Sequence, residues 1–280
     1  MKKTHEVIEY FFKDNAARFA KETILKYKQS LRQFFSFCQK EFDEVKTADI
    51  RAWLSALDEA GQKPRTLNTR LVALRSFYQY CLEENFIQKK PTLNIDLPKK
   101  EEPLPVYLEK NEMAQLMEAA KDHPRERVLL ETLYATGVRA RELLNIQLSD
   151  IKWDTRQIWI RKGKGNKDRF VLFTTECAER LKEYLANRNI ESPYLFANRR
   201  GKHLSRAWLQ KIFCRYAAEL DLGRKFTPHI MRHTFASHLA EKDMPQSYIQ
   251  ELLGHVNINS TRIYTRLNAK ARKTQYDSFQ

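Results

Sequence analysis

The stretch KKPTLNIDLPKKEEPLPVYL, residues 89–108, divides the chain. It holds four prolines among many charged residues, and proline cannot donate the backbone hydrogen bond that a helix interior needs. A chain of 280 residues is long enough for two domains that each bury a core. We therefore predict one domain over residues 1–96, a linker over 97–106 and a second domain over 107–280.

Apolar residues recur at helical spacing before this stretch. Shorter helical patterns lie near residues 5–18 and 47–60. Two longer helices are marked by Ile24, Tyr27, Leu31, Phe34 and Phe35, and by Leu67, Leu71, Leu74, Phe77, Tyr78 and Leu82. The first domain is therefore predicted to be a small bundle of four or five helices.

Helices alternate with short β patterns after the stretch. QIWIR (157–161) and RFVLF (169–173) are rich in β-branched and aromatic residues and flank GKGNKD. A glycine-bearing turn between two such runs is typical of a β-hairpin. The chain is therefore predicted to be mainly α-helical with a small β-sheet, which lies in a mixed α/β second domain.

The net charge of the chain is +15, and such a field attracts polyanions, with nucleic acid as the first candidate. Residues 152–215 alone hold 16 Lys and Arg against 6 Asp and Glu. A single basic helix face is also typical of ordinary solvated surface, but one on each domain would suit a clamp around a DNA duplex. The candidate DNA contacts are Lys28, Arg32, Arg65, Arg70, Lys167 and Arg169.

Several other classes of protein are excluded by the composition. No run approaches the roughly 18 apolar residues of a membrane-spanning helix, and the N-terminus lacks the apolar core of a signal peptide, so we expect a cytoplasmic protein. His233 and His238 lack companions at zinc-ligand spacing, and the aspartates form no metal-binding cluster. The cysteines show no CxxC pair and are expected to be reduced core residues: Cys38, Cys81, Cys177 and Cys214.

The segment TPHIMRHTFASHL, residues 227–239, has the features of a helix start. Thr227 is a good N-cap, and Pro228 suits the first helical position. His229 and Arg232 are three residues apart and share a helix face, close to the open N–H groups that favour a phosphate. An HxxR pair alone is a weak signal because it also occurs by chance.

Two more basic motifs lie upstream. In ATGVRARELLNI, residues 135–146, Gly137 can end one helix before another begins. Glu142 follows Arg139 by three positions and can hold its guanidinium still. In RKGKGNKDR, Lys164 lies between two glycines, where it can approach a bound backbone closely. Each motif alone is equally compatible with a surface ion pair or a simple phosphate-contacting turn.

The last motif is LLGHVNINSTRIYTRL, residues 252–267, in which Tyr264 follows His255 by nine positions. Tyr264 stands among polar residues, although packing is the usual role of a single tyrosine. A phenol with an ordinary pKa of about 10 becomes a nucleophile when cations stabilise the phenolate or a base accepts its proton. The basic residues of the other motifs would stabilise phosphoryl transfer with protein charge alone.

In order and spacing, ATGVRARELL, GKGNKDR, PHIMRHTFASHL and LLGHVNINSTRIYTRL resemble the catalytic motifs of the tyrosine recombinase (phage integrase) family, especially its short Xer-like members. The resemblance extends from residue 107 to the end of the chain. The first hundred residues resemble, less specifically, the family's helical SAM-like core-binding domain. Single motifs are weak, but four in order form a strong signal.

The resemblance implies a role for each basic motif. Arg139 and Arg232 match the two arginines that grip the non-bridging oxygens of the scissile phosphate. Lys164 matches the hairpin lysine that acts as general acid toward the departing 5′ oxygen. No metal ion, ATP or other cofactor is implied.

The remaining positions also match the family pattern. Tyr264 matches the nucleophile that forms a 3′-phosphotyrosine, and His229 matches the position that exchanges a proton with it. His255 matches a residue that hydrogen-bonds the phosphate, and Glu142 matches the acidic residue that positions the first arginine. The resemblance thus implies a site-specific DNA recombinase.

The resemblance also implies an assembly. Four protomers would join two double-stranded DNA core sites with inverted repeats, pass through a Holliday junction, and interlock through the residues after Tyr264. A paralogous recombinase or an accessory protein as a further partner stays open. The biological role also stays open among resolution of chromosome, plasmid or transposon cointegrate multimers and integration or excision of a mobile element.

Two other functions are compatible with the same motifs and basic charge. A type IB topoisomerase-like enzyme would apply the same chemistry to relax DNA as a monomer, and a non-catalytic DNA-binding protein would use only the basic surface. The compact first domain and the short tail favour assembly over a monomer. Supercoil relaxation with no strand exchange between two cognate sites would favour the topoisomerase.

Overall fold

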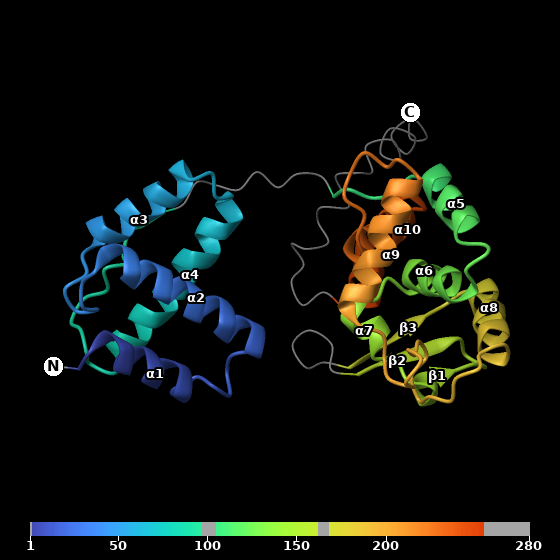
Figure 1. Ribbon diagram of the computed structural model, residues 1–280, viewed down its shortest axis with the longest axis horizontal. Helices are drawn as coiled ribbons and strands as arrows, with labels where there is room; N and C mark the ends of the chain where they lie inside the picture. The colour runs from blue at the N-terminus through green and yellow to red at the C-terminus, as the bar shows by residue number, and fades with distance from the viewer. Residues whose placement is uncertain (1, 97–104, 162–167, 255–280) are drawn as a thin grey trace. The chain divides into compact units, whose positions relative to one another are not determined.

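The computed structural model describes residues 2–96, 105–161 and 168–254. Contacts between Cα atoms divide the chain into two compact units, Met1–Glu102 and Pro103–Gln280 (Figure 1). The boundary between the units lies inside the stretch 97–106 that was predicted as the linker.

The first unit is a helical bundle. Within its described residues it consists of α1 (Thr4–Asp14), α2 (Lys21–Cys38), α3 (Thr47–Glu59) and α4 (Pro64–Glu83). The helical bundle predicted for this part of the chain is confirmed. Proline at the first position of α4 suits a helix start because its missing N–H has no partner there anyway.

Aromatic rings hold the first unit together. Phe77 of α4 is fully buried and its ring meets Phe11 of α1 edge-on at 5.7 Å and Phe35 of α2 at 5.8 Å. On α3, Trp53 packs against Phe34 of α2 at 5.2 Å. Edge-to-face pairs of this kind are favoured by the ring quadrupole, so one cluster joins all four helices.

The second unit combines helices with a small sheet. Its elements are α5 (Lys110–Ala119), α6 (Pro124–Thr136), α7 (Ala140–Leu144), the 3-10 helix η1 (Leu148–Asp150), β1 (Ile151–Lys152), β2 (Gln157–Ile160), β3 (Arg169–Leu172), α8 (Thr175–Ala186), α9 (Arg206–Glu219), α10 (Pro228–Glu241) and α11 (Gln246–Leu253). In the described part of the chain, no helix is long and apolar enough to cross a lipid bilayer. The mixed α/β domain is confirmed.

The three strands form an antiparallel sheet in the order β1-β2-β3. Strands β2 and β3 are the two runs predicted to form the hairpin, with Trp159 opposite Phe170 and Ile160 opposite Arg169. Strand β1 was not predicted, because two residues are too few to show the alternation that marks a strand.

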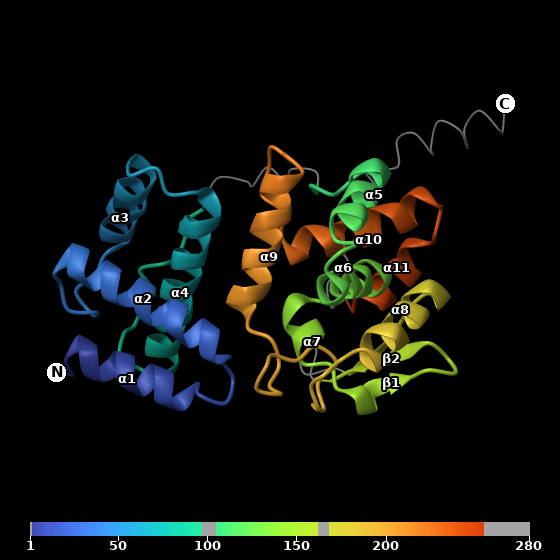
Figure 2. The ribbon, with the colours of Figure 1, turned by 45° about the vertical axis from the view of Figure 1, so that its right-hand side comes forward.

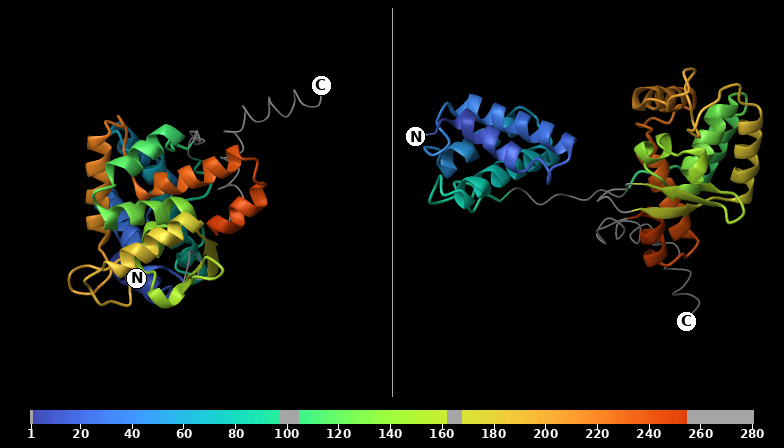
Figure 3. Two further views of the ribbon diagram at one scale, coloured as in Figure 1. Left: turned by 90° about the vertical axis from the view of Figure 1, so that its right-hand side faces the viewer. Right: turned by 90° about the horizontal axis from the view of Figure 1, so that it is seen from below.

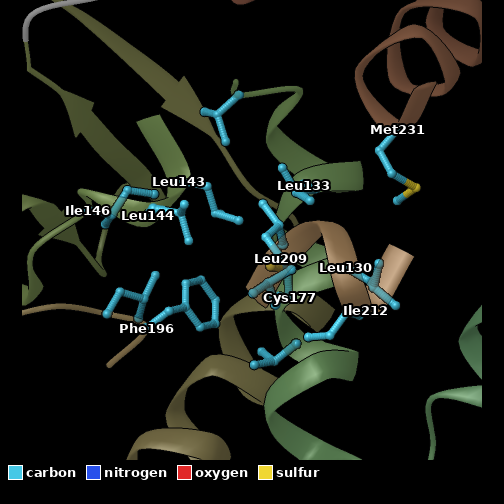
Figure 4. Close-up of a cluster of buried hydrophobic side chains, with 14 of the residues drawn as sticks. Leu130, Leu133, Leu143, Leu144, Ile146, Cys177, Phe196, Leu209, Ile212 and Met231 are labelled. Atoms are coloured by element: carbon cyan, nitrogen blue, oxygen red, sulfur yellow. The ribbon is translucent and has the colours of Figure 1, made fainter. Parts of the chain in front are cut away.

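Helix α6 is the centre of the second unit. It packs against α10, α8 and β3 (Figure 3). Leu133 of α6 lies in a core with Leu143 and Leu144 of α7, Phe196, and Met231 of α10, all of them buried (Figure 4). Helix α11 lies against α10 (Figure 2) and also contacts β3. This packing brings the ends of α6 and α11 to the same side of α10.

Two helix ends near these contacts lie where the sequence predicted them. The Thr227 hydroxyl accepts a hydrogen bond from the Ile230 N–H at 3.4 Å and is the N-cap of α10, as predicted. Gly137 ends α6 in a left-handed conformation with φ of 59°, which glycine adopts without a Cβ penalty. The predicted helix break at Gly137 is therefore also confirmed.

One expectation about the cysteines is wrong. Cys81 and Cys177 are buried, but Cys38 is only half-buried and Cys214 is exposed. The buried stripe of α9 is formed by Leu209, Ile212, Phe213 and Tyr216. Ile212 and Phe213 form the two edges of this stripe, and Cys214 lies about 100° beyond the Phe213 edge, which turns it away from the core.

Replacing Gly137 with alanine is expected to destabilise the fold more than the same change at Gly223. Both glycines have a positive φ, 59° and 60°, so each alanine introduces left-handed strain of about 1–2 kcal/mol. Only at Gly137 would the new Cβ also meet a side chain, 2.7 Å from Cε1 of Phe235, and overpacking adds about 1–3 kcal/mol. Urea unfolding of both variants measures the difference, and equal losses would contradict this packing.

Candidate active site

Residues from three sequence motifs meet at the carboxyl end of α11. Arg139 is the N-cap of α7 and Arg232 lies in the second turn of α10. The Nη2 atom of Arg232 lies 2.6 Å from the Leu253 carbonyl oxygen, and Nη2 of Arg139 lies 3.4 Å from the Gly254 carbonyl oxygen. The two arginines that were predicted to grip one phosphate therefore reach the same helix end.

Arg232 is a buried cation with only 2% of its surface exposed. Its Nη1 donates to the Gly137 carbonyl at 2.7 Å while Nη2 donates to Leu253. These carbonyls belong to the ends of α6 and α11, where the helix dipoles favour a positive charge. A buried charge is tolerated when it is paired and hydrogen-bonded, so the side chain is fixed by two helix ends at once.

Arg139 is held by the carboxylate of Glu142. Its backbone N–H donates to Oε2 at 2.8 Å and its Nη1 to Oε1 at 2.7 Å. The same carboxylate accepts two hydrogen bonds from Arg169 at the start of β3, at 3.1 Å and 2.8 Å. Glu142 therefore joins two guanidinium groups, and the predicted contact between Arg139 and Glu142 is present.

The carboxyl group of Glu142 is strongly acidic. Burial acts to raise its pKa, but the hydrogen bonds and charge of Arg169, followed by those of Arg139, lower the pKa to about 2. The group is therefore ionised at neutral pH. One carboxylate between two guanidinium groups leaves a positive charge uncompensated, which keeps the cluster attractive to an anion.

His229 and His233 lie on consecutive turns of α10. His229 is exposed, and the two imidazole rings meet edge-on with centroids 4.3 Å apart. Burial, followed by the charges of His229 and Arg232, lowers the pKa of His233 to about 4. His233 is therefore neutral at neutral pH, whereas His229 stands at the solvent edge where a substrate can reach it.

His238, the other histidine considered for zinc, has partners on both ring nitrogens. Its Nε2 lies 2.9 Å from the Leu108 carbonyl oxygen, and its Nδ1 lies 2.8 Å from the Tyr134 hydroxyl. A carbonyl only accepts, so Nε2 carries the proton and Nδ1 accepts from tyrosine. Among the described residues, no group of three His, Cys, Asp or Glu is arranged to hold a metal ion.

Four predicted site residues lie outside the described residues, namely Lys164, Lys167, His255 and Tyr264. Described residues adjoin them in the sequence. Strands β2 and β3 lead into and out of the segment with the two lysines. Gly254, the C-cap of α11, directly precedes His255.

The basic candidates of the first unit lie on two neighbouring helices. Lys28 and Arg32 are exposed on α2, and Arg65 is exposed on α4. Arg70 of α4 is half-buried and donates to the amide oxygen of Gln33 on α2. That contact shows that α2 and α4 adjoin at these two residues.

Arg169 has a protein partner that the sequence did not predict. It was predicted to contact DNA, whereas in the structure only 13% of its side chain is exposed and both Nη atoms bind Glu142. The sequence showed only that a basic residue stands at the base of the predicted hairpin. Nothing in local spacing links it to a glutamate 27 residues away.

Comparison with known proteins identifies the family of the chain. The chain matches the Phage integrase family over residues 106–271 and the Phage integrase N-terminal SAM-like domain over residues 9–85. It is 34% identical over 265 residues to tyrosine recombinase XerC of Anoxybacillus flavithermus, which covers 89% of this chain and 88% of that protein. It is 33% identical over 271 residues to tyrosine recombinase XerD of Staphylococcus saprophyticus, which covers 92% of each.

Two solved structures of recombinases are also similar to this chain. The XerH site-specific recombinase bound to a palindromic difH substrate, in a post-cleavage complex, has a TM-score of 0.77 at 26% identity and covers 90% of this chain and 78% of that one. The crystal structure of XerA recombinase has a TM-score of 0.57 at 29% identity and covers 99% of both chains. The similarity therefore extends over both units.

The contribution of Glu142 to stability is expected to fall as the pH falls. The pKa of its carboxyl is lowered from 4.5 to about 2 by folding, so the folded chain binds this proton less readily than the unfolded chain. The stabilisation is complete above about pH 4.5 and disappears toward about pH 2.

Urea unfolding of the wild type and Glu142→Gln checks this expectation. The difference between their unfolding free energies should be largest near neutral pH and should shrink between about pH 5 and about pH 3. A difference that stays constant over this range would contradict the ion pairs of Glu142.

Proposed function

Because the chain belongs to the phage integrase family and is a tyrosine recombinase of the Xer type, we propose that Tyr264 is the nucleophile with which it cuts DNA. The enzyme catalyses site-specific DNA strand exchange. One observation carries the assignment of the nucleophile. Arg139 and Arg232 converge on Leu253 and Gly254, immediately before the segment with His255 and Tyr264.

In the proposed reaction, the phenol oxygen of Tyr264 attacks the scissile phosphorus. The bond between phosphorus and the 5′ oxygen breaks, and the DNA 3′ end becomes a phosphotyrosine. His229 accepts the phenol proton, and Lys164 donates a proton to the departing 5′ oxygen. The ester keeps the energy of the broken bond, so a 5′ hydroxyl of another strand can reverse the step and rejoin the DNA without ATP.

The arginines are proposed to act on the charge of the phosphate. The guanidinium groups of Arg139 and Arg232 would bind the two non-bridging oxygens, whose charge increases in the transition state. His255 would add a hydrogen bond to the same group. Glu142 supports this role because it orients Arg139 and, being shared with Arg169, does not neutralise both cations.

We propose that the DNA partner is a double-stranded core site with inverted repeats. The first unit would contact it through Lys28, Arg32, Arg65 and Arg70, and Lys167 would contact it from the hairpin. Such contacts release counterions, so binding should weaken steeply with salt. Four protomers, with or without a paralogous partner, would join two core sites in the cytoplasm and pass through a Holliday junction.

Strand exchange distinguishes this proposal from relaxation of DNA by the same chemistry. A core site can be obtained by selecting random duplexes for tight binding to the purified chain. A plasmid with two such sites should yield recombinant circles. Relaxed plasmid without any recombinant would support the topoisomerase-like alternative, and neither product together with tight binding would support a non-catalytic DNA-binding protein.

Tyr264→Phe is expected to bind the core site as tightly as the wild type and to form no covalent adduct with it, because only the attacking oxygen is lost. Gel shift measures binding, and a denaturing gel with a nicked duplex that traps the cut strand measures the adduct. Tyr248→Phe is a matched control, since Tyr248 is exposed at 60% on α11. An adduct formed by Tyr264→Phe would eliminate Tyr264 as the nucleophile.

Lys164→Ala is expected to slow cleavage by about 10² to 10⁴, the usual range for a general acid. A duplex with sulfur in place of the bridging 5′ oxygen should remove most of this loss, because a thiolate leaves without a proton. Single-turnover cleavage of both duplexes measures the effect. If Lys164→Ala cut the ordinary duplex as fast as the wild type, the general-acid role would be wrong.

A further inference from the structure

Arg169 has an unusual combination of contacts for a basic residue at the base of a hairpin. It is the first residue of β3 and pairs with Ile160 in the sheet. Its Nη1 and Nη2 atoms contact the two oxygens of Glu142 at 3.1 Å and 2.8 Å. Two parallel hydrogen bonds of this kind fix the plane of a carboxylate as well as its position.

The fixed carboxylate in turn determines where Arg139 points. Glu142 is only 8% exposed, whereas the Arg139 side chain is 28% exposed. An arginine at the surface would otherwise sample many rotamers, since a solvent-exposed ion pair restrains little. With Arg169 bound on one edge of the carboxylate, Glu142 offers Arg139 one fixed acceptor.

Arg169 also packs against the helix end that Arg139 reaches. Gly254 has a φ of 61°, and a Cβ at this position would lie 2.8 Å from Cδ and 2.9 Å from Nε of Arg169. Nη2 of Arg139 lies 3.4 Å from the Gly254 carbonyl oxygen. The stem of Arg169 and the head of Arg139 therefore contact the same residue.

The charge balance of the cluster depends on Arg169 as well. Without it, Glu142 and Arg139 would form a neutral pair, and the attraction of Arg139 for a phosphate would be largely offset. With it, three charged groups carry one net positive charge. Within the described residues, Nε of Arg169 is buried without a hydrogen-bond partner, a cost that packing alone does not explain.

We propose that Arg169 is a positioning residue for DNA cleavage, which holds Glu142 so that Arg139 faces the scissile phosphate with its charge available. The inference rests on the proposed function, because it takes the role of Arg139 from it. It also replaces the earlier expectation that Arg169 contacts DNA directly. Arg169 touches no reacting atom and acts only through Glu142 and Arg139.

Arg169→Gln is expected to slow covalent cleavage of the core-site duplex by about ten- to a hundredfold, because small displacements of a phosphate-binding group are costly. Arg169→Lys keeps the charge but not the two-pronged contact and should fall between Arg169→Gln and the wild type. Binding of the duplex should change little, since Arg169 makes no direct contact with DNA. Arg224→Gln is the matched control, because Arg224 contacts both oxygens of Glu112 at 2.6 Å and 2.5 Å in the same unit.

A modified duplex separates positioning from a general loss of structure. Replacing one non-bridging oxygen of the scissile phosphate with a methyl group gives a neutral methylphosphonate, which no longer needs the charge of Arg139. If Arg169 acts through Arg139, the defect of Arg169→Gln should shrink several-fold on this duplex, as should that of Arg139→Ala. A damaged fold would lower cleavage of both duplexes equally.

Three results would overturn the inference. The first is cleavage by Arg169→Gln at the wild-type rate, and the second is an equal loss of rate on the ordinary and the methylphosphonate duplex. The third is rescue of Arg169→Gln by sulfur at the 5′ bridging position instead of by the methyl group, which would indicate action through Lys164. Failure of the wild type itself to form an adduct on either duplex would instead overturn the proposed function, and this inference with it. The wild-type reaction therefore distinguishes the two failures.

Discussion

The second unit is organised around positive charges that must be held inside protein without being cancelled. Arg232 is almost wholly buried, and it is tolerated there because the carboxyl ends of α6 and α11 supply its acceptors. Arg139 and Arg169 share one carboxylate. In both cases the partners orient a guanidinium group while leaving positive charge available, which is what recognition of a phosphate requires.

The fold provides this arrangement through its helix ends. Gly137 and Gly254 end α6 and α11 in left-handed turns, which present the last carbonyls to the arginines. Phe235 and Arg169 fill the space against the two glycines, so a side chain at Gly137 would displace Phe235, three residues after Arg232, and one at Gly254 would displace Arg169. Structural residues and site residues are therefore in direct contact, and a change in packing here should alter chemistry as well as stability.

Much of this could be predicted from the sequence where the interactions are local. The cap at Thr227, the break at Gly137, the hairpin strands and the contact of Arg139 with Glu142 all depend on residues a few positions apart, and spacing reveals them. The contact of Arg169 with Glu142 joins β3 to α7 across 27 residues of sequence. No periodicity encodes a contact between such distant residues, which is why it was not predicted. Exposure of Cys214 was missed because its apolar surroundings alone were considered, although the helical spacing of Leu209, Ile212, Phe213 and Tyr216 excludes position 214 from the buried side of α9.

The central claim is that this buried, charge-retaining cluster serves a tyrosine that becomes joined to DNA. The most direct measurement is to trap the wild-type enzyme on a nicked core-site duplex, digest the complex with nuclease and trypsin, and locate the remaining nucleotide by mass spectrometry. The account predicts a nucleotide on Tyr264, in the peptide spanning residues 263–266. A nucleotide on any other residue, or none on a complex that has cut its DNA, would contradict it.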